Sequence, residues 1–100
     1  MPKQSFLKLG IYLKDLRTAA GFSQGGMGKA LGYSTPQLVS NWERGMCKIP
    51  LAKINDFATL VKFDSKKLKE HFIQILVEDY ERELREELFP TKPKNKKSAE

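Results

Sequence analysis

Apolar side chains recur every three or four residues along most of this chain, which is the spacing of one face of a helix. In the first such stretch Leu9, Leu13, Leu16 and Ala20 follow one another at spacings of four, three and four. Glycine, proline and hydroxyl-bearing residues interrupt the pattern where helices would end and begin. The pattern predicts four helices, at about residues 6–20, 24–31, 36–44 and 51–61, and then a long fifth helix at 65–89. The expected fold is therefore all-α.

The ends of these helices are marked by particular residues. Thr35 can cap the third helix by accepting a bond from a backbone N–H of its first turn, and Pro36 suits the first helical position. Gly45 then ends that helix. Asp64 or Ser65 can cap the last helix, which would be about 36 Å long.

The inward positions of the first four helices should form one core. In the third helix Leu38, Val39 and Trp42 fall at helical spacing and are expected to face inward. Trp42 could instead stack on a base, but its inward phase favours the core. The expected cluster is Leu13, Leu16, Met27, Leu31, Leu38, Trp42, Ile54, Phe57 and Val61.

The outer face of the third helix carries Gln37, Ser40, Asn41 and Arg44. Gln and Asn are amides, which present a donor and an acceptor side by side. That pairing matches the N6/N7 edge of adenine in the major groove of DNA. The amides alone fit a solvated polar surface equally well. Other features of the chain are needed to distinguish a DNA-contacting face from a solvated one.

The length and charge of the chain favour the DNA-contacting interpretation of this face. With 100 residues, 40% of them hydrophobic, the chain has the size of one small domain with a modest core. The net charge is +6 and the pI about 9.5. Residues 1–77 hold twelve Lys and Arg against five acids, so the excess of positive charge lies in the predicted domain. Such a surface favours a polyanionic partner.

Several classes of protein are not indicated. No apolar run approaches the roughly 18 residues of a membrane span, and the start lacks the apolar core of a secretory signal, so we expect a cytosolic protein without a membrane partner. Cys47 is the one cysteine and His71 the one histidine, which excludes an internal disulfide and indicates no metal site or other cofactor. The acids have no partnered nucleophile in a motif spacing, so we expect no enzyme.

A set of spaced positions resembles a known family. The set is Leu13, Arg17, Gly21, Ser23–Gln24, Leu31–Gly32 and the run Ser40–Asn41–Trp42–Glu43–Arg44–Gly45. Residues from about Leu9 to Leu68 are similar to the Xre/Cro-type, lambda-repressor-like family of helix-turn-helix DNA-binding domains. The chain departs from the usual pattern at Gly25, Gly26 and Gly28, and its link into the third helix is one residue longer than the commonest form.

The resemblance implies roles for individual residues. Gln37, Ser40 and Asn41 occupy positions that touch base edges, while Gln24 occupies that of a phosphate contact. The further phosphate contacts expected are Thr35, Arg44 and Lys48, although Arg44 and Lys48 could also be ordinary surface charges. The resemblance also implies a buried structural ion pair between Arg17 and Glu43.

The long last helix is apolar nearly all round its axis at 72–77, so a single domain core can cover only one of its sides. We therefore predict a dimer interface formed by Phe72, Ile73, Leu76, Val77, Tyr80 and Leu84. Lysines lie near the start of this helix and acids near its end, which favours an antiparallel pair centred near Leu76 and Val77. The basic tail at 90–100 is too poor in apolar residues to fold.

The expected organisation is a helix-turn-helix domain at 1–65, a dimerisation helix at 65–89 and a disordered tail. The function that fits is a transcriptional regulator, specifically a repressor, that binds a palindromic operator in double-stranded DNA as a homodimer through the major groove. Two alternatives stay open. The chain could be an antitoxin whose long helix masks a toxin, or a protein-interaction module without DNA binding.

Overall fold

The computed structural model describes residues 4–90, which form five α-helices and no strand. The helices are α1 (Gln4–Ala19), α2 (Gln24–Ala30), α3 (Gln37–Glu43), α4 (Leu51–Leu60) and α5 (Ser65–Leu88). The all-α, five-helix fold predicted from the sequence is confirmed, and each helix begins and ends within two residues of its predicted range. Except for Pro90, the tail predicted at 90–100 lies outside the described residues.

Side-chain oxygens satisfy the free N–H groups at the start of three helices. Ser23 Oγ accepts from an N–H of the first turn of α2 at 2.9 Å, and Asp64 Oδ1 accepts from one of α5 at 2.9 Å. Thr35 Oγ1 accepts from the N–H of Gln37 at 3.3 Å, as predicted for α3. Pro36 occupies the cap position, so α3 begins one residue later than expected.

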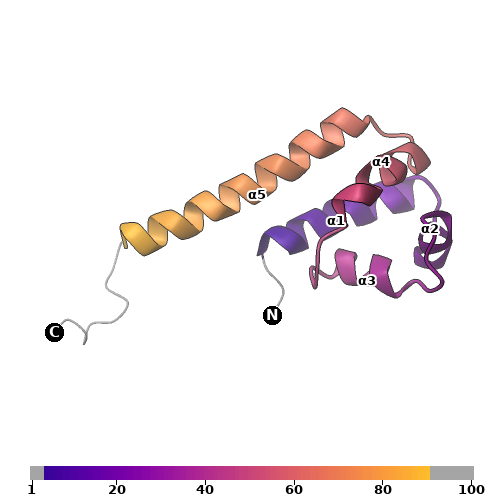
Figure 1. Cartoon of the computed structure of the whole chain (residues 1–100), viewed down its shortest axis with the longest axis horizontal. Coiled ribbons are helices and arrows are strands. Elements are labelled where there is room, and N and C mark those ends of the chain that lie inside the picture. Colours follow the sequence, from indigo (N-terminus) through magenta and orange to yellow (C-terminus); the bar gives the residue numbers. More distant parts are fainter. Residues whose placement is uncertain (1–3, 91–100) are drawn as a thin grey trace.

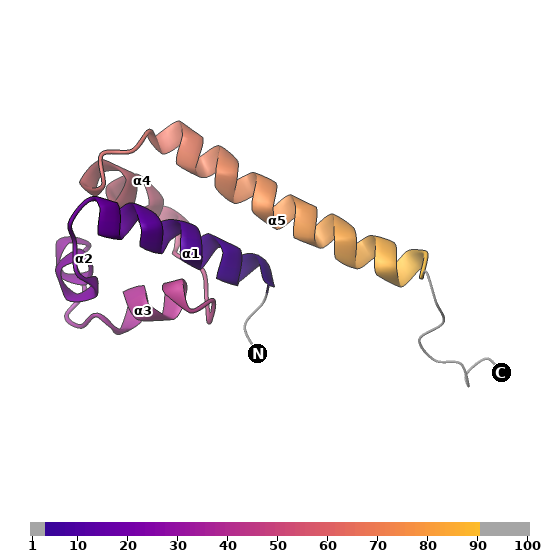
Figure 2. The ribbon, with the colours of Figure 1, turned by 180° about the vertical axis from the view of Figure 1, so that it is seen from behind.

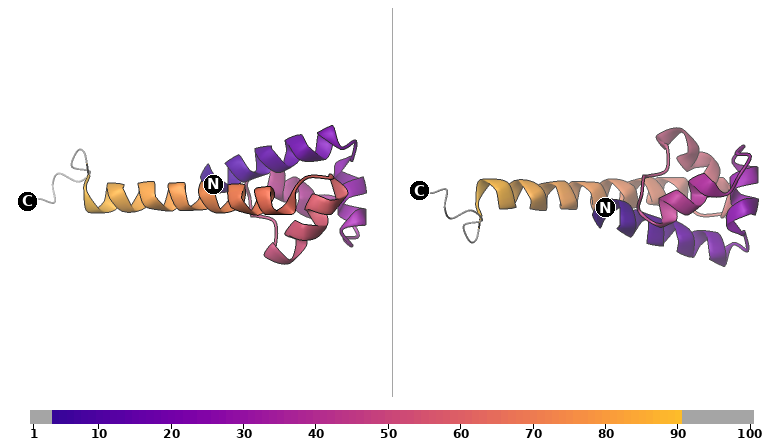
Figure 3. Two further views of the ribbon diagram at one scale, coloured as in Figure 1. Left: turned by 90° about the horizontal axis from the view of Figure 1, so that it is seen from above. Right: turned by 90° about the horizontal axis from the view of Figure 1, so that it is seen from below.

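The first four helices form a compact group, and α5 extends beyond it. Figures 1 and 2 show α1 and α5 side by side and running in opposite directions, with α3 below α1. The short helix α2 lies beside the C-terminal end of α1. In Figure 3 α5 is a straight rod with the other helices gathered at its N-terminal end. The molecule measures 56 × 26 × 21 Å, and it is elongated because α5 extends beyond the other helices. No helix within residues 4–90 is long and apolar enough to cross a membrane.

The core differs from the predicted one at Leu38, whose side chain is 39% exposed. Three positions of α3 are buried: Val39, Trp42 and Glu43. Successive residues of a helix are separated by about 100° around the axis, so these three span one side and Leu38 falls at its edge. The apolar residues alone would centre the buried side of α3 between Leu38 and Val39. Burial of Glu43 against Arg17 shifts that side toward Glu43 and leaves Leu38 at the surface. The prediction that Leu38 faces the core is therefore wrong.

Phe72 is a second correction. It was predicted in the dimer interface, but it is 4% exposed and belongs to the core of its own domain. Leu76, which the sequence also places in the dimer interface, is partly buried against the same core, as are Leu16 and Val61. The remaining buried hydrophobic residues are Leu9, Leu13, Met27, Leu31, Val39, Trp42, Ile49, Ile54, Phe57, Ala58 and Leu68.

Two contacts fix the position of α1 against its neighbours. A Cβ added at Gly10 would lie 2.2 Å from the carbonyl oxygen of Trp42, so only glycine lets α1 approach the end of α3 so closely. On the other side of α1, the buried Asp79 of α5 forms ion pairs with Arg82 and, at 3.7 Å, with Lys8. The middle of α5 is thereby held against α1.

Candidate nucleic-acid interface

The outward side of α3 carries a polar row. Gln37 and Arg44 are exposed, and Ser40 and Asn41 are partly exposed, on the side opposite the buried Val39. Gln37, Asn41 and Arg44 follow one another at spacings of four and three, so they share one strip of the helix surface. The three residues predicted to contact bases are therefore brought together on one accessible face.

Hydrogen bonds join this row. Asn41 Oδ1 accepts from Gln37 Nε2 at 3.0 Å and from Arg44 NH2 at 2.8 Å. A guanidinium only donates, so the Asn41 oxygen rather than its nitrogen must face Arg44. With that oxygen engaged, the group that Asn41 has left to offer a ligand is its NH₂ donor. Gln37, whose nitrogen faces Asn41, offers its carbonyl oxygen as an acceptor.

A buried ionic network holds α3 in place. Arg17 Nε donates to Glu43 Oε2 at 2.5 Å, and Arg17 NH2 donates to Glu43 Oε1 at 3.0 Å. Arg17 NH1 donates to the carbonyl oxygen of Phe22 at 2.7 Å, which ties in the turn between α1 and α2. Gln24 Nε2 donates to Glu43 Oε1 at 2.9 Å. One carboxylate at the end of α3 thus joins α1, α2 and α3, and the residues implied as an ion pair by the resemblance are in contact.

The link between α2 and α3 is fixed by aromatic contacts. Tyr33 packs edge-on against Trp42, with ring centroids 5.9 Å apart. Lys53 of α4 reaches over the Tyr33 ring at 5.2 Å and donates to the carbonyl oxygen of Leu31 at 2.8 Å. Burial raises the pKa of Tyr33 above its usual range. The link is therefore braced by α4, and α3 has a defined direction relative to the rest of the domain.

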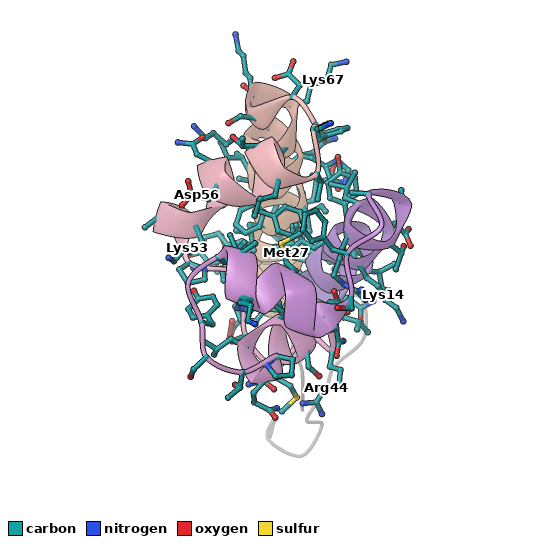
Figure 4. The ribbon with its side chains drawn as sticks, turned by 90° about the vertical axis from the view of Figure 1, so that its right-hand side faces the viewer. Lys14, Met27, Arg44, Lys53, Asp56 and Lys67 are labelled. Atoms are coloured by element: carbon teal, nitrogen blue, oxygen red, sulfur yellow. The ribbon has the colours of Figure 1, made fainter. Side chains whose placement is uncertain are left out.

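The four predicted phosphate contacts are placed differently. Arg44 and Lys48 are exposed, and Figure 4 shows Arg44 at the periphery while Met27 lies among the helices. Thr35 is exposed and also bonds the start of α3. Gln24 is half-buried, and one of its amide hydrogens is already donated to Glu43, so any phosphate contact would use what remains of the amide.

An open hollow of about 300 Å³ lies beside the start of α3. It is lined by Gly25, Gly26, Lys29, Tyr33, Ser34, Thr35 and Pro36. A Cβ added at Gly25 would meet nothing within 4 Å, so this glycine leaves room at the surface and is not required by packing. The sequence shows these glycines but not the hollow, because it forms only where the link into α3 folds back beside α2. Among residues 4–90 no three His, Cys, Asp or Glu side chains are grouped as metal ligands would be.

The chain is similar to known helix-turn-helix proteins in sequence and in structure. The family model of the helix-turn-helix domain matches residues 8–72 of the chain. A solved structure, the restriction-modification controller protein C.AhdI from Aeromonas hydrophila, superimposes with a TM-score of 0.59 at 30% sequence identity, covering 66% of this chain and 98% of that chain. The chain belongs to the Xre-type helix-turn-helix family. It is accordingly a DNA-binding transcriptional regulator. A search among proteins of curated function found no match.

Within this domain α2 and α3 are the two helices joined by the turn that gives the motif its name. The family match ends at residue 72, so the outer part of α5 lies beyond it.

Proposed function

We propose that this regulator is a repressor that binds a palindromic operator as a homodimer, with α3 of each copy in the major groove. The observation that carries the proposal is the hydrogen-bonded row of Gln37, Asn41 and Arg44 on the outward side of α3, opposite a buried side that holds the helix rigidly. A helix with one face fixed in a core and a polar face exposed can enter the groove without refolding.

The bonds within the row suggest how bases are read. Asn41 has its oxygen engaged and so presents donors, which fit the O6 and N7 acceptors of guanine or the O4 of thymine. Gln37 presents an acceptor, which fits the exocyclic amine of adenine or cytosine. A two-bond contact from Asn41 to adenine, as the amide alone suggested, would require Asn41 to turn away from Arg44. Ser40, on the same side, can donate or accept.

Contacts to the DNA backbone would come from the ends of α3. Arg44 and Lys48 lie at its C-terminal end and Thr35 at its N-terminal end, so they flank the row. Charged contacts of this kind supply affinity and register without sequence information, and they weaken as salt is added.

The second half of the proposal concerns α5. Five exposed apolar side chains follow one another along it at spacings of four, three, four and four: Ile73, Val77, Tyr80, Leu84 and Leu88. This stripe lies about 140° around the helix axis from the buried residues that pack on the domain, and its spacing is that of a coiled-coil seam. A second copy supplies an identical stripe, so it can cover this one.

An antiparallel pair fits the stripe. Centred between Val77 and Tyr80, it would set Ile73 against the partner's Leu84 and Val77 against the partner's Tyr80. This centre lies slightly further along the helix than the sequence suggested, because Phe72 is used by the domain core.

Charge also favours this direction. Lys66, Lys67 and Lys69 lie near the start of α5, whereas Glu86 and Glu87 lie near its end. An antiparallel pair brings Lys69 within about one turn of the partner's two glutamates. A parallel pair would place like charges together at both ends.

Duplex binding tests the proposal. Wild-type protein should bind duplexes selected from a random pool, with affinity that falls steeply as salt rises. Changing Gln37 and Asn41 to Ala should abolish the preference among duplexes, whereas the control Gln74→Ala, an exposed amide on α5, should not. Arg44→Ala should lower the salt slope by about 0.9 per copy if the side chain neutralises one phosphate. Binding that ignores Gln37 and Asn41 would contradict the proposal.

The dimer is tested separately by light scattering and cross-linking. The mass in solution should be twice the 11.4 kDa of the chain, and Val77→Glu should halve it. In a Cys47→Ser background, a mixture of Val77→Cys and Tyr80→Cys variants should form a disulfide between the two variants. Val77→Cys alone would cross-link in a parallel pair.

A protein that stays monomeric at high micromolar concentration would contradict the proposed dimer. A different protein that co-purifies bound to α5 would favour the antitoxin alternative. If the protein is a repressor, its expression should lower the output of a reporter gene placed downstream of a promoter that contains the selected site.

A further inference from the structure

Leu38 is an apolar side chain at the boundary between the buried side of α3 and the side that carries the polar row. It is 39% exposed, at the second position of the helix, between Gln37 and the buried Val39 in sequence. Around the helix axis it lies about 60° from Asn41, so the two side chains flank one another at the surface. Single exposed leucines are common on proteins and need no explanation by themselves. This one stands beside the groups proposed to read bases.

The core does not account for it. The buried side of α3 is complete with Val39, Trp42 and Glu43, and the ionic contact of Glu43 with Arg17 fixes the helix in that rotation. Leu38 therefore stays at the edge of the outward side, next to Asn41, where a ligand that contacts Asn41 can also reach it.

We propose that Leu38 reads a thymine by packing against its C5-methyl group, beside the base contacted by Asn41. The proposal rests on the proposed function, in which α3 enters the major groove. In that groove the methyl group of thymine is the apolar group that a base pair presents, and contact with it is a recognised form of readout. A leucine beside the polar row would otherwise remove water from polar base edges without replacing their hydrogen bonds, which costs affinity.

The expected effect is small and measurable. Burying one methyl-sized group contributes about 0.8 kcal/mol, which is about a four-fold change in affinity for each half-site. A pair of half-sites changed together should lose about fifteen-fold.

Deoxyuridine provides a probe that changes only this group. It pairs like thymidine and keeps O4, but it lacks the methyl group. In duplexes selected by the wild-type protein, each thymine of the half-site is replaced in turn by deoxyuridine. Binding is measured by fluorescence anisotropy for wild type, Leu38→Ala and Leu38→Gln. The control is Met46→Ala, which removes another exposed apolar side chain just after α3. Thermal melts show that each variant is folded, and Leu38→Gln preserves side-chain length if alanine is not tolerated.

We expect one thymine per half-site at which deoxyuridine weakens wild-type binding about four-fold. The same replacement should leave the affinity of both Leu38 variants unchanged, while Met46→Ala should respond as wild type does. The inference is overturned if the variants keep the full methyl dependence, if no thymine responds in wild type, or if the selected half-site has no thymine. If wild type binds no duplex at all, the proposed function fails and this inference with it, so the two failures are distinguishable.

Discussion

Removing the carboxylate of Glu43 is the perturbation whose consequence the structure determines most sharply. Glu43 receives two bonds from Arg17 and one from Gln24, at 2.5, 3.0 and 2.9 Å. The side chains of Arg17 and Glu43 are only 8% and 4% exposed. In Glu43→Ala the guanidinium of Arg17 would remain buried without its counter-charge. Removing one partner of a buried ion pair costs about 3–5 kcal/mol.

That loss is large for a small domain. Total stabilities are about 5–15 kcal/mol, and each kcal/mol shifts the melting temperature of a domain of this size by roughly 4–8 °C. Glu43→Ala should therefore melt at least about 12 °C below wild type, and at the upper end it would be unfolded at room temperature. The measurement is thermal and urea unfolding followed by circular dichroism at 222 nm.

A matched control separates burial from charge. Glu81 pairs with Arg85 at 3.0 Å on α5, but the Glu81 side chain is 57% exposed and that of Arg85 69%. An exposed pair of this kind contributes about 0.3–0.5 kcal/mol, so Glu81→Ala should melt close to wild type. The double variant Arg17→Met with Glu43→Met leaves no unpaired charge and should be more stable than Glu43→Ala. A Glu43→Ala protein within about 1 kcal/mol of wild type would refute the reasoning.

Three further predictions concern packing. Gly25→Ala should stabilise the domain by about 0.5–1 kcal/mol in urea unfolding, because the added Cβ meets open space in a helix; a loss of stability would show that the surroundings are not open. Gly10→Ala should instead prevent folding, judged by circular dichroism, since its Cβ would overlap the Trp42 carbonyl; a wild-type melt would contradict the close approach. Phe72→Ala should cost about 3–5 kcal/mol as a core change, whereas Ile73→Ala should mainly weaken self-association in light scattering; the reverse pattern would return Phe72 to the interface.

The helices and their ends could be predicted from the sequence because local signals set them. Apolar spacing locates α1, α4 and α5, and the residues that cap or end a helix, such as Ser23, Thr35 and Asp64, act on their own immediate neighbours. The outward placement of Gln37 and Asn41 could be predicted for the same reason, since it follows from helical phase once Trp42 faces inward.

The rotation of α3 could not be predicted from apolar spacing, because it depends on a contact between distant parts of the chain that only the family resemblance indicated. Apolar residues alone place Leu38 inward, whereas the contact of Glu43 with Arg17, 26 residues away, turns it outward. The same holds for Gly10, because the need for glycine there arises only from the close approach of the Trp42 carbonyl oxygen at the end of α3. The bonds that orient Asn41 depend on the side-chain conformations of its neighbours, which residue types do not specify.

Selection of bound duplexes from a random pool tests the central claim, that α3 reads DNA in the major groove as part of a dimer. The expected result is enrichment of an inverted repeat whose half-sites lie about one helical turn apart, roughly 34–36 Å between centres. Selection with Gln37 and Asn41 changed to Ala should lose the preferred bases within the half-sites. Failure of the wild-type protein to enrich any sequence, or the same enriched repeat from the altered protein, would contradict the account.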